Sequence, residues 1–132
     1  MVANRLVQQA PTEPRHVLLA AGETTVSVTG KGIGGRNQEL ALGAINSIAV
    51  QTHIALASMG TDGIDNSDVA GAIIDSTSLG AAQKKKLDVA KALADNDSYT
   101  FFKKLGKHAI KTGPTGTNVA DVMVVVRGPL KK

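Results

Sequence analysis

Residues 30–39 read Gly-Lys-Gly-Ile-Gly-Gly-Arg-Asn-Gln-Glu and lead directly into an amphipathic segment that extends from Asn37 to about Val50. The apolar residues of that segment recur at intervals of three and four: Leu40, Ala41, Ala44, Ile45 and Ile48. This spacing is typical of a helix that buries one face. The stretch therefore predicts a glycine loop followed by a helix, a unit that layered α/β domains use.

Short apolar or β-branched segments on both sides of this helix predict strands. The first two are separated only by a tight turn at Gly22 and Glu23, so we expect them to form an antiparallel hairpin. The expected strands are residues 17–20, 24–29, 53–58, 108–111 and 119–126. Because strands alternate with helices around this hairpin, we expect a three-layer α/β domain with a mixed β-sheet flanked by helices.

The middle of the chain is predicted to be helical, with three short helices between residues 76 and 105. Their expected N-caps are Ser76 or Thr77, then Asp88, then Asp97, and Gly106 is the expected stop of the third. The 132 residues fit one domain. We expect residues 1–15 to be a tail or linker and residues 16–132 to form the domain.

Composition excludes several classes of function. The chain has no cysteine, which removes disulfides, thiolate nucleophiles and cysteine-bound zinc and is compatible with a reducing cytosol. No apolar run approaches the ~18 residues of a membrane span, and the N-terminus is too polar for a signal peptide, so we expect a soluble cytoplasmic protein with no membrane partner. The net charge is +4, but no aromatic residues interleave with the lysine clusters, so we expect no nucleic-acid partner.

Gly30, Gly32 and Gly35 satisfy the G-x-G-x-x-G pattern of dinucleotide-binding folds, and Asp62 lies about where a ribose-binding acid would sit. Three features count against that interpretation. The preceding strand is predicted to be the second arm of a hairpin, Asp62 is embedded in a long polar loop, and the chain is too short for both a cofactor domain and a substrate domain. We therefore expect no bound dinucleotide.

A more general interpretation is an anion site, because a glycine loop at a helix N-terminus exposes backbone N–H groups beside a partial positive charge. Arg36 would add a bidentate guanidinium and Lys31 a mobile cation. The alternative is a tight turn with a solvated Arg36. Four glycines within six residues, followed directly by Arg36 and Asn37, favour the anion site.

Three further polar features fall near predicted strand ends, where open α/β sheets place ligands. Asp62 either binds substrate hydroxyls or organises Mg²⁺, or else it closes an Asx-turn on its own backbone, as we expect for Asp68. Residues 113–118 offer hydroxyls and turn amides for a carboxylate or phosphate, or form only a cluster of β-turns. Asp121, within an apolar run, is expected to be an anchor, and Glu23 is expected to orient Arg36 or Lys31 through an ion pair. The three histidines are scattered, so we assign them no chemistry, and we expect no metal site.

Several of these motifs, in this order and spacing, resemble the MOFRL domain, the C-terminal part of type 2 glycerate kinases that are also described as hydroxypyruvate reductase-like. The resemblance covers about Val17 to Val126. It departs from the family pattern at Ala20-Ala21, where the family usually has glycine before Gly22, and in a shorter loop after Asp65. The motifs are Gly22-Glu-Thr-Thr-Val, residues 30–42, Gly60-Thr-Asp-Gly-Ile-Asp, Asn96-Asp-Ser-Tyr-x-Phe-Phe and Thr112-Gly-Pro-Thr-Gly-Thr-Asn-Val-x-Asp.

The resemblance implies ATP-dependent phosphorylation of glycerate to 2-phosphoglycerate, with Mg²⁺, in a cleft between two domains. ATP and Mg²⁺ would be bound in the complete enzyme, with an absent N-terminal nucleotide-binding domain supplying most of the ATP site. We expect this domain to bind neither alone and to be inactive without that partner. The alternatives are a stand-alone small-anion-binding or interaction module, and a part of an NAD(P)H-dependent hydroxypyruvate reductase.

The site residues follow from these arguments. Arg36 is the predicted catalytic residue, because phosphoryl transfer depends on positioned cations more than on covalent chemistry. The predicted substrate- or phosphate-binding residues are Glu23, Lys31, Gly32, Gly34, Gly35, Asn37, Asp62, Thr115, Thr117 and Asn118.

Overall fold

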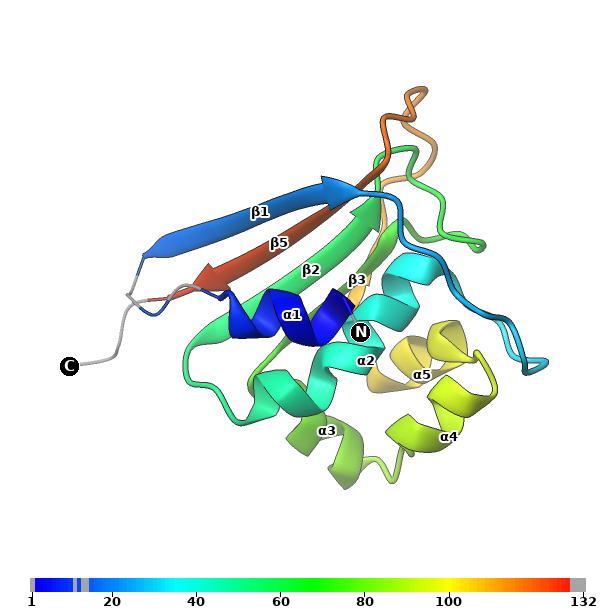
Figure 1. Ribbon diagram of the computed structural model, residues 1–132. Helices are drawn as coiled ribbons and strands as arrows, with labels where there is room; N and C mark the ends of the chain where they lie inside the picture. Colours follow the sequence, from blue (N-terminus) through cyan, green and yellow to red (C-terminus); the bar gives the residue numbers. More distant parts are fainter. Residues whose placement is uncertain (1, 11, 13–14, 129–132) are drawn as a thin grey trace.

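The computed structural model describes residues 2–10, 12 and 15–128. They form five helices and five strands, and the fold is α/β as predicted (Figure 1). Residues 1, 11, 13, 14 and 129–132 of the predicted tail and domain lie outside the described residues. The elements are α1 (Val2–Gln8), β1 (His16–Gly22), α2 (Arg36–Ala49), β2 (Ile54–Gly60), β3 (Gly71–Asp75), α3 (Ser78–Lys84), α4 (Val89–Ala94), α5 (Ser98–Leu105), β4 (Ala109–Ile110) and β5 (Asp121–Arg127).

The sheet has the strand order β1-β5-β2-β3-β4, and every neighbouring pair is antiparallel. The expected mixed sheet is therefore wrong. The last strand, β5, lies at the centre of the three long strands and pairs along its whole length with β1 on one side and β2 on the other. This insertion of β5 separates β1 from β2, which would otherwise have been parallel neighbours.

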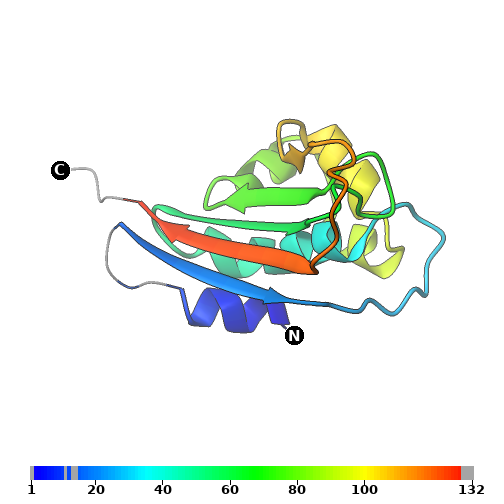
Figure 2. The same cartoon turned by 90° about the horizontal axis from the view of Figure 1, so that it is seen from above.

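The helices lie on one face of the sheet (Figures 1 and 2), so the domain has two layers where we expected three. The core lies between the layers, where the apolar side of α2 packs against β2 and β3. Ala41, Ala44, Ile45 and Ile48 of α2 are fully buried, as the periodicity of the sequence predicted, and Leu42 is buried in addition. The opposite face of the sheet carries no helix among the described residues.

Residues 24–29, predicted as the second strand of a hairpin, do not join the sheet. β1 is an edge strand that pairs with β5 on one side, and residues 24–29 do not pair with its other side. Residues 23–34 cross from the end of β1 to the α4–α5 region (Figure 2), where the amides of Thr29 and Gly30 each donate to Asn96 Oδ1 at 2.8 Å. The segment is extended because it is tied to a loop between helices, not because it pairs with a strand.

Two further elements differ from the sequence expectations. Strand β3 was not predicted, because its five residues, Gly-Ala-Ile-Ile-Asp, are too few to distinguish from a helical region by pattern. Residues 2–8 form α1, whose Ala3, Leu6 and Val7 are buried against the core. They are therefore not a free tail, while the domain boundary after residue 15 stays a prediction.

The helix signals were largely correct. The Asp88 side chain caps α4 by accepting the amide of Lys91 at 2.9 Å, and Gly106 ends α5 with a φ of 80°, in the left-handed region that favours glycine. Asp97 stands at the N-cap of α5, but its carboxylate accepts the amide of Ile33 at 3.0 Å instead of an amide of its own helix.

Candidate functional site

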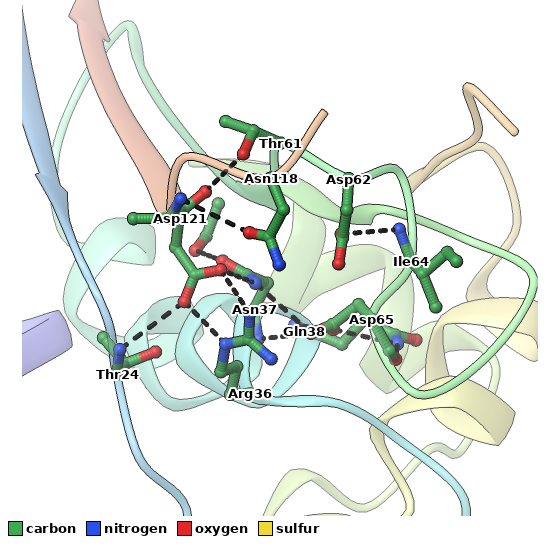
Figure 3. Close-up of polar contacts among 12 residues, drawn as sticks. Thr24, Arg36, Asn37, Gln38, Thr61, Asp62, Ile64, Asp65, Asn118 and Asp121 are labelled. Atoms are coloured by element: carbon green, nitrogen blue, oxygen red, sulfur yellow. Dashed lines mark hydrogen bonds and ion pairs between the residues drawn. The ribbon is translucent and has the colours of Figure 1, made fainter. Parts of the chain in front are cut away.

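The polar residues converge where three strand ends meet one helix N-terminus (Figure 3). Gly22, the last residue of β1, and Gly60, the last residue of β2, both pair with Asp121, the first residue of β5. Arg36, the first residue of α2, points at this junction. The antiparallel insertion of β5 thus brings Asp121 next to a helix that begins 85 residues earlier.

Arg36 and Asp121 form a bidentate ion pair. The Arg36 Nε donates to Asp121 Oδ2 at 2.7 Å, and Nη2 donates to Oδ1 at 2.8 Å. The Asp121 side chain is fully buried, while that of Arg36 is 32% exposed. Burial alone would raise the pKa of Asp121, but the hydrogen bonds from Arg36 and Asn37 outweigh it and hold that pKa below its usual value. The same hydrogen bond raises the pKa of Arg36, so both groups are charged at neutral pH.

Asp65 caps the N-terminus of α2. Its carboxylate accepts the backbone amide of Asn37 at 3.0 Å and that of Gln38 at 2.8 Å, and it also accepts the Gln38 side-chain amide at 3.1 Å. These amides are among the donors that a helix leaves without intrahelical partners. The chain therefore supplies its own anion where we expected an external one.

Asn37 links the two buried carboxylates. Its Nδ2 donates to Asp65 Oδ1 at 3.2 Å and to Asp121 Oδ1 at 3.0 Å, while its Oδ1 accepts the Ser58 hydroxyl at 2.6 Å. Asn37 is fully buried. We predicted that it binds substrate; both polar atoms of its side chain already have internal partners, which favours a positioning role.

The glycine loop contacts the α4–α5 connection with most of its amides. Besides the Gly30 amide described above, the Lys31 amide donates to the Asp95 carboxylate at 3.0 Å and the Gly32 amide donates to the Asp95 carbonyl at 2.8 Å. The Ile33 amide donates to the Asp97 carboxylate at 3.0 Å. These internal partners correct our expectation that the loop amides, including that of Gly32, face an anion.

Close packing explains why these positions are glycine. A Cβ on Gly30 would lie 2.2 Å from the Asp95 backbone, and one on Gly35 would lie 2.2 Å from the Asp65 carbonyl oxygen. Backbone atoms cannot give way at that distance, so no larger side chain fits. The loop still borders a hollow, because Gly32, Gly34 and Gly35 line with Arg36 a cavity of about 380 Å³.

The ion pair that we expected between Glu23 and Arg36 or Lys31 is absent among the described residues, and the carboxylate that orients Arg36 is Asp121. Glu23 is exposed and lines a second cavity of about 410 Å³, beside Arg36 and Glu39. Lys31 lies in the part of the loop that contacts Asp95, and its ammonium group lines neither of these cavities.

Asp62 and Asn118 lie on the solvent side of the ion pair, with side chains that point to the same space (Figure 3). Asp62 Oδ1 accepts the amide of Ile64 at 3.0 Å, which is the Asx-turn alternative. Its charge still acts on the site, since it helps to raise the pKa of Arg36 after the larger contributions of Asp121 and Asp65, while burial acts in the opposite direction.

Residues 113–118 form an exposed loop that is anchored at Thr115. Its amide donates to the Asp62 carbonyl at 3.1 Å and its hydroxyl donates to the Thr61 carbonyl, so Thr115 holds the loop against the end of β2. Thr117 and Asn118 remain exposed beyond this anchor. The structure therefore brings Asn118 and Asp62 to the Arg36 site and uses Thr115 to keep them there.

A comparison with known proteins places these residues in a family. The model of the MOFRL family matches residues 16–121. The chain belongs to the MOFRL family. Over 118 residues it is 42% identical to a glycerate 2-kinase of Pyrococcus horikoshii, a match that covers 88% of this chain and 26% of that protein. It is 44% identical over 115 residues to a D-glycerate 2-kinase of Thermotoga maritima, covering 86% of this chain and 27% of that one.

Solved structures agree with this assignment. The crystal structure of a glycerate kinase from Thermotoga maritima superimposes with a TM-score of 0.85 at 40% identity, covering 96% of this chain and 31% of that chain. This MOFRL chain thus spans about a quarter of the length of the curated relatives it matches.

The dinucleotide pattern has no matching context in this MOFRL fold. The segment before the glycine loop is not a strand, the sheet is antiparallel, and the amides of residues 30–33 are occupied. Among the described residues, no group of three or more His, Asp or Glu side chains could hold a metal ion. No helix in the described ranges is long and apolar enough to cross a membrane.

Sequence reasoning missed three residues that build the site: Asp65, Gln38 and Ser58. Ser58 carried a recognisable signal, because it is a polar residue at an inward position of an otherwise apolar strand. Asp65 could have been suspected as a distant cap, but nothing local distinguishes it from Asp62 three residues earlier. Only the fold shows that Asp65 is buried at the N-terminus of α2, while Asp62 is partly exposed.

Proposed function

We propose that the chain supplies part of the substrate-binding half of a glycerate 2-kinase site, in which Arg36 binds the glycerate carboxylate or the phosphoryl group in transfer. One observation carries the proposal. Asp121 holds the Nε and one Nη2 donor of Arg36, while Nη1 makes no hydrogen bond within the described part of the chain. The Nη1–Nη2 edge of the guanidinium is therefore free to bind a carboxylate or phosphate with two donors.

Asp121 has two effects on such a site. It fixes the plane of the guanidinium, so that little side-chain entropy is lost when an anion binds. It also neutralises part of the charge, and with Asp62 and Asp65 nearby the chain carries more carboxylates than cations at this point. A dianionic phosphoryl group would therefore need further cations from outside this chain.

The two groups that the relatives' activity implies, ATP and Mg²⁺, do not find a complete site here. Mg²⁺ prefers carboxylate oxygens and waters in octahedral geometry. Asp65 and Asp121 are fully buried and accept internal donors, so solvent reaches the partly exposed Asp62 and the exposed Glu23 among the described carboxylates discussed for this site. We propose that the remaining polypeptide of a longer enzyme supplies both groups, and we derive no step through either of them.

The test is a coupled assay of glycerate-dependent ATP consumption. We expect no turnover by the 132-residue chain alone. We expect turnover when the chain replaces the matched segment of the Pyrococcus horikoshii glycerate 2-kinase. Turnover by the chain alone would refute the half-site. Saturable binding of glycerate or phosphate to the chain, with an inactive but folded fusion, would point to a small-anion-binding module instead.

A further inference from the structure

The face of the sheet opposite the helices, here called the outer sheet face, is aliphatic over four strands. Side chains alternate along each strand, so that one set packs on the helices and the other points away from them. Apart from Asp75 at one corner and the bare Gly71, the outward positions are Val17, Leu19, Ala21, Ala55, Ala57, Met59, Ile73, Val122, Val124 and Val126.

No described residue of the domain covers these side chains fully. Leu19 is 69% exposed, Val17 55%, Ile73 41% and Val126 37%. An apolar patch that is continuous across several strands marks an interaction surface, whereas single exposed apolar residues are ordinary. The register makes this patch continuous, because Val124 lies between Leu19 on β1 and Ala57 on β2.

The sequence of the central strand, β5, also indicates that the sheet is covered on both faces. Antiparallel strands with one solvated face alternate between apolar and polar residues, while strands that are covered on both faces read as continuous apolar runs. Residues 122–126 read Val-Met-Val-Val-Val without a polar residue. β5 therefore has the composition of a strand that is buried on both faces.

We propose that the outer sheet face docks the apolar sides of two helices from the polypeptide that completes the longer relatives, which would add a third layer to this domain. The size of the face supports this occupant. Four strands ~4.8 Å apart, three of seven residues and β3 of five, at ~3.3 Å per residue, present roughly 400 Å². A stable dimer buries about 800 Å² on each partner, which is more than this face offers. Contacts between domains of one chain begin at about 600 Å² summed over both domains, which a face of this size can supply.

The dimensions also fit helices. Packed helices lie about 10 Å apart, so two helices of about 15 residues would cover the face side by side. The small side chains of Ala21, Ala55 and Ala57 would let them approach closely. The relatives have enough polypeptide for this layer, because the chain accounts for 26% of the Pyrococcus horikoshii protein.

The absence of cysteine from the chain allows a direct test, since a single introduced thiol reports its own exposure. Leu19→Cys lies on the outer sheet face. Val50→Cys is the matched control, because Val50 is 81% exposed at the C-terminal end of α2, away from this face. The rate of reaction with DTNB is measured in the chain alone and in a cysteine-free Pyrococcus horikoshii enzyme that carries this chain in place of its matched segment.

We expect the Leu19→Cys thiol to react at least about tenfold more slowly in the fusion than in the chain alone, and the Val50→Cys thiol to react within about twofold in both. Equal rates for Leu19→Cys would overturn the proposal. Slow reaction in the chain alone, together with a doubled mass by light scattering, would assign the face to a second copy and would also overturn it. If the fusion does not fold, the remaining polypeptide of the relative is added as a separate chain to each cysteine variant. The DTNB rates of the Leu19→Cys and Val50→Cys thiols, with and without it, then test the proposal.

This inference shares with the proposed function the premise of a completing polypeptide, but its readout does not depend on turnover. A protected thiol in an inactive, folded fusion would support the docking surface and count against the kinase half-site. A reactive thiol in an active fusion would support the kinase half-site and overturn the docking surface.

Discussion

The described part of the chain shows two ion pairs whose groups are chemically similar and whose surroundings differ. The Arg36–Asp121 pair has side-chain exposures of 32% and 0%, whereas the Lys111–Asp68 pair has exposures of 66% and 54%. Asp121 also accepts hydrogen bonds from Asn37 and from the Thr24 amide, while Asp68 accepts only one further donor, the Tyr99 hydroxyl, among the described residues. Only the first pair belongs to a network that joins a helix terminus to three strands.

The comparison shows how burial changes what an ion pair does. An exposed pair is screened by salt and contributes little to stability. A buried carboxylate cannot exchange its partners for water, so each partner becomes a requirement of the fold. The four predictions below test this difference, from the largest expected effect to the smallest.

The largest effect is expected on catalysis. In the active fusion, Arg36→Ala should lower kcat/KM by about 10³-fold or more, which is in the range of a lost arginine in phosphoryl transfer. Lys111→Ala, which removes the cation of the exposed pair, should leave kcat/KM within about twofold, because exposed pairs are weakly coupled to their surroundings. Arg36→Lys should restore part of the loss, since an ammonium keeps the charge and loses the bidentate geometry.

Steady-state kinetics with circular dichroism on each variant makes this measurement. Arg36→Ala at near-wild-type kcat/KM and with an unchanged spectrum would mean that the anion binds elsewhere.

The next effect concerns the cap of α2. Asp65→Ala should lower the free energy of unfolding by about 3 kcal/mol, because it leaves the buried backbone amides of Asn37 and Gln38 without acceptors and removes one acceptor from each of their side-chain amides. The matched variant is Asp68→Ala, three residues later and exposed, which should leave the urea midpoint unchanged within error. Equal losses from the two variants would show that the burial of Asp65 is not what matters.

A smaller effect is expected for Asp121→Asn, which keeps the shape of the side chain and removes its charge, at a cost of about 2 kcal/mol at neutral pH. The folded pKa of Asp121 lies below its ordinary value of 3.8. Its ionised form therefore stabilises the fold fully above that value, and this contribution is lost as the pH falls through the folded pKa.

Urea unfolding of the wild type and of Asp121→Asn between about pH 6 and pH 3 should thus give a difference that shrinks on acidification. A difference that is constant over this range would mean that the charge of Asp121 does not stabilise the fold.

The smallest effect is expected at the exposed pair. The hydrogen bond from Lys111 lowers the pKa of Asp68, with a further contribution from Tyr99. Because both partners are exposed, about 0.5 M NaCl should return this pKa toward its ordinary value, while the pKa of the buried Asp121 should respond much less. Carboxyl NMR titrations at low and high salt compare the two groups in one sample, and an equal response would remove the distinction between the pairs.

The elements that the sequence predicted well are those whose signals are local. The α2 periodicity, the Asp88 cap and the Gly106 stop depend on residues within one or two turns of one another. The elements that it predicted poorly depend on distant partners. Residues 24–29 have the alternation of a strand but are held by Asn96 between α4 and α5, and the short β3 becomes a strand because β2 and β4 lie on either side of it.

The candidate site divides in the same way. Arg36 was identified from its position between a glycine loop and a helix start, and Asp121 was expected to be an anchor because it interrupts an apolar run. Their pairing, and the exclusion of Glu23 from it, follow from the insertion of β5 between β1 and β2. No spacing in the sequence encodes a contact between residues 36 and 121.

The sequence by itself determined the family, the α/β class and the helix that carries Arg36, because motif order and helical periodicity are properties of neighbouring residues. Only the tertiary structure decided that Asp65 fills the N-terminus of α2, that the glycines serve close packing against Asp95 and Asp65, and that one apolar sheet face remains open. The physical reason is that buried polar groups and apolar faces must each find a partner, and the chain's long-range pairing selects which partner that is.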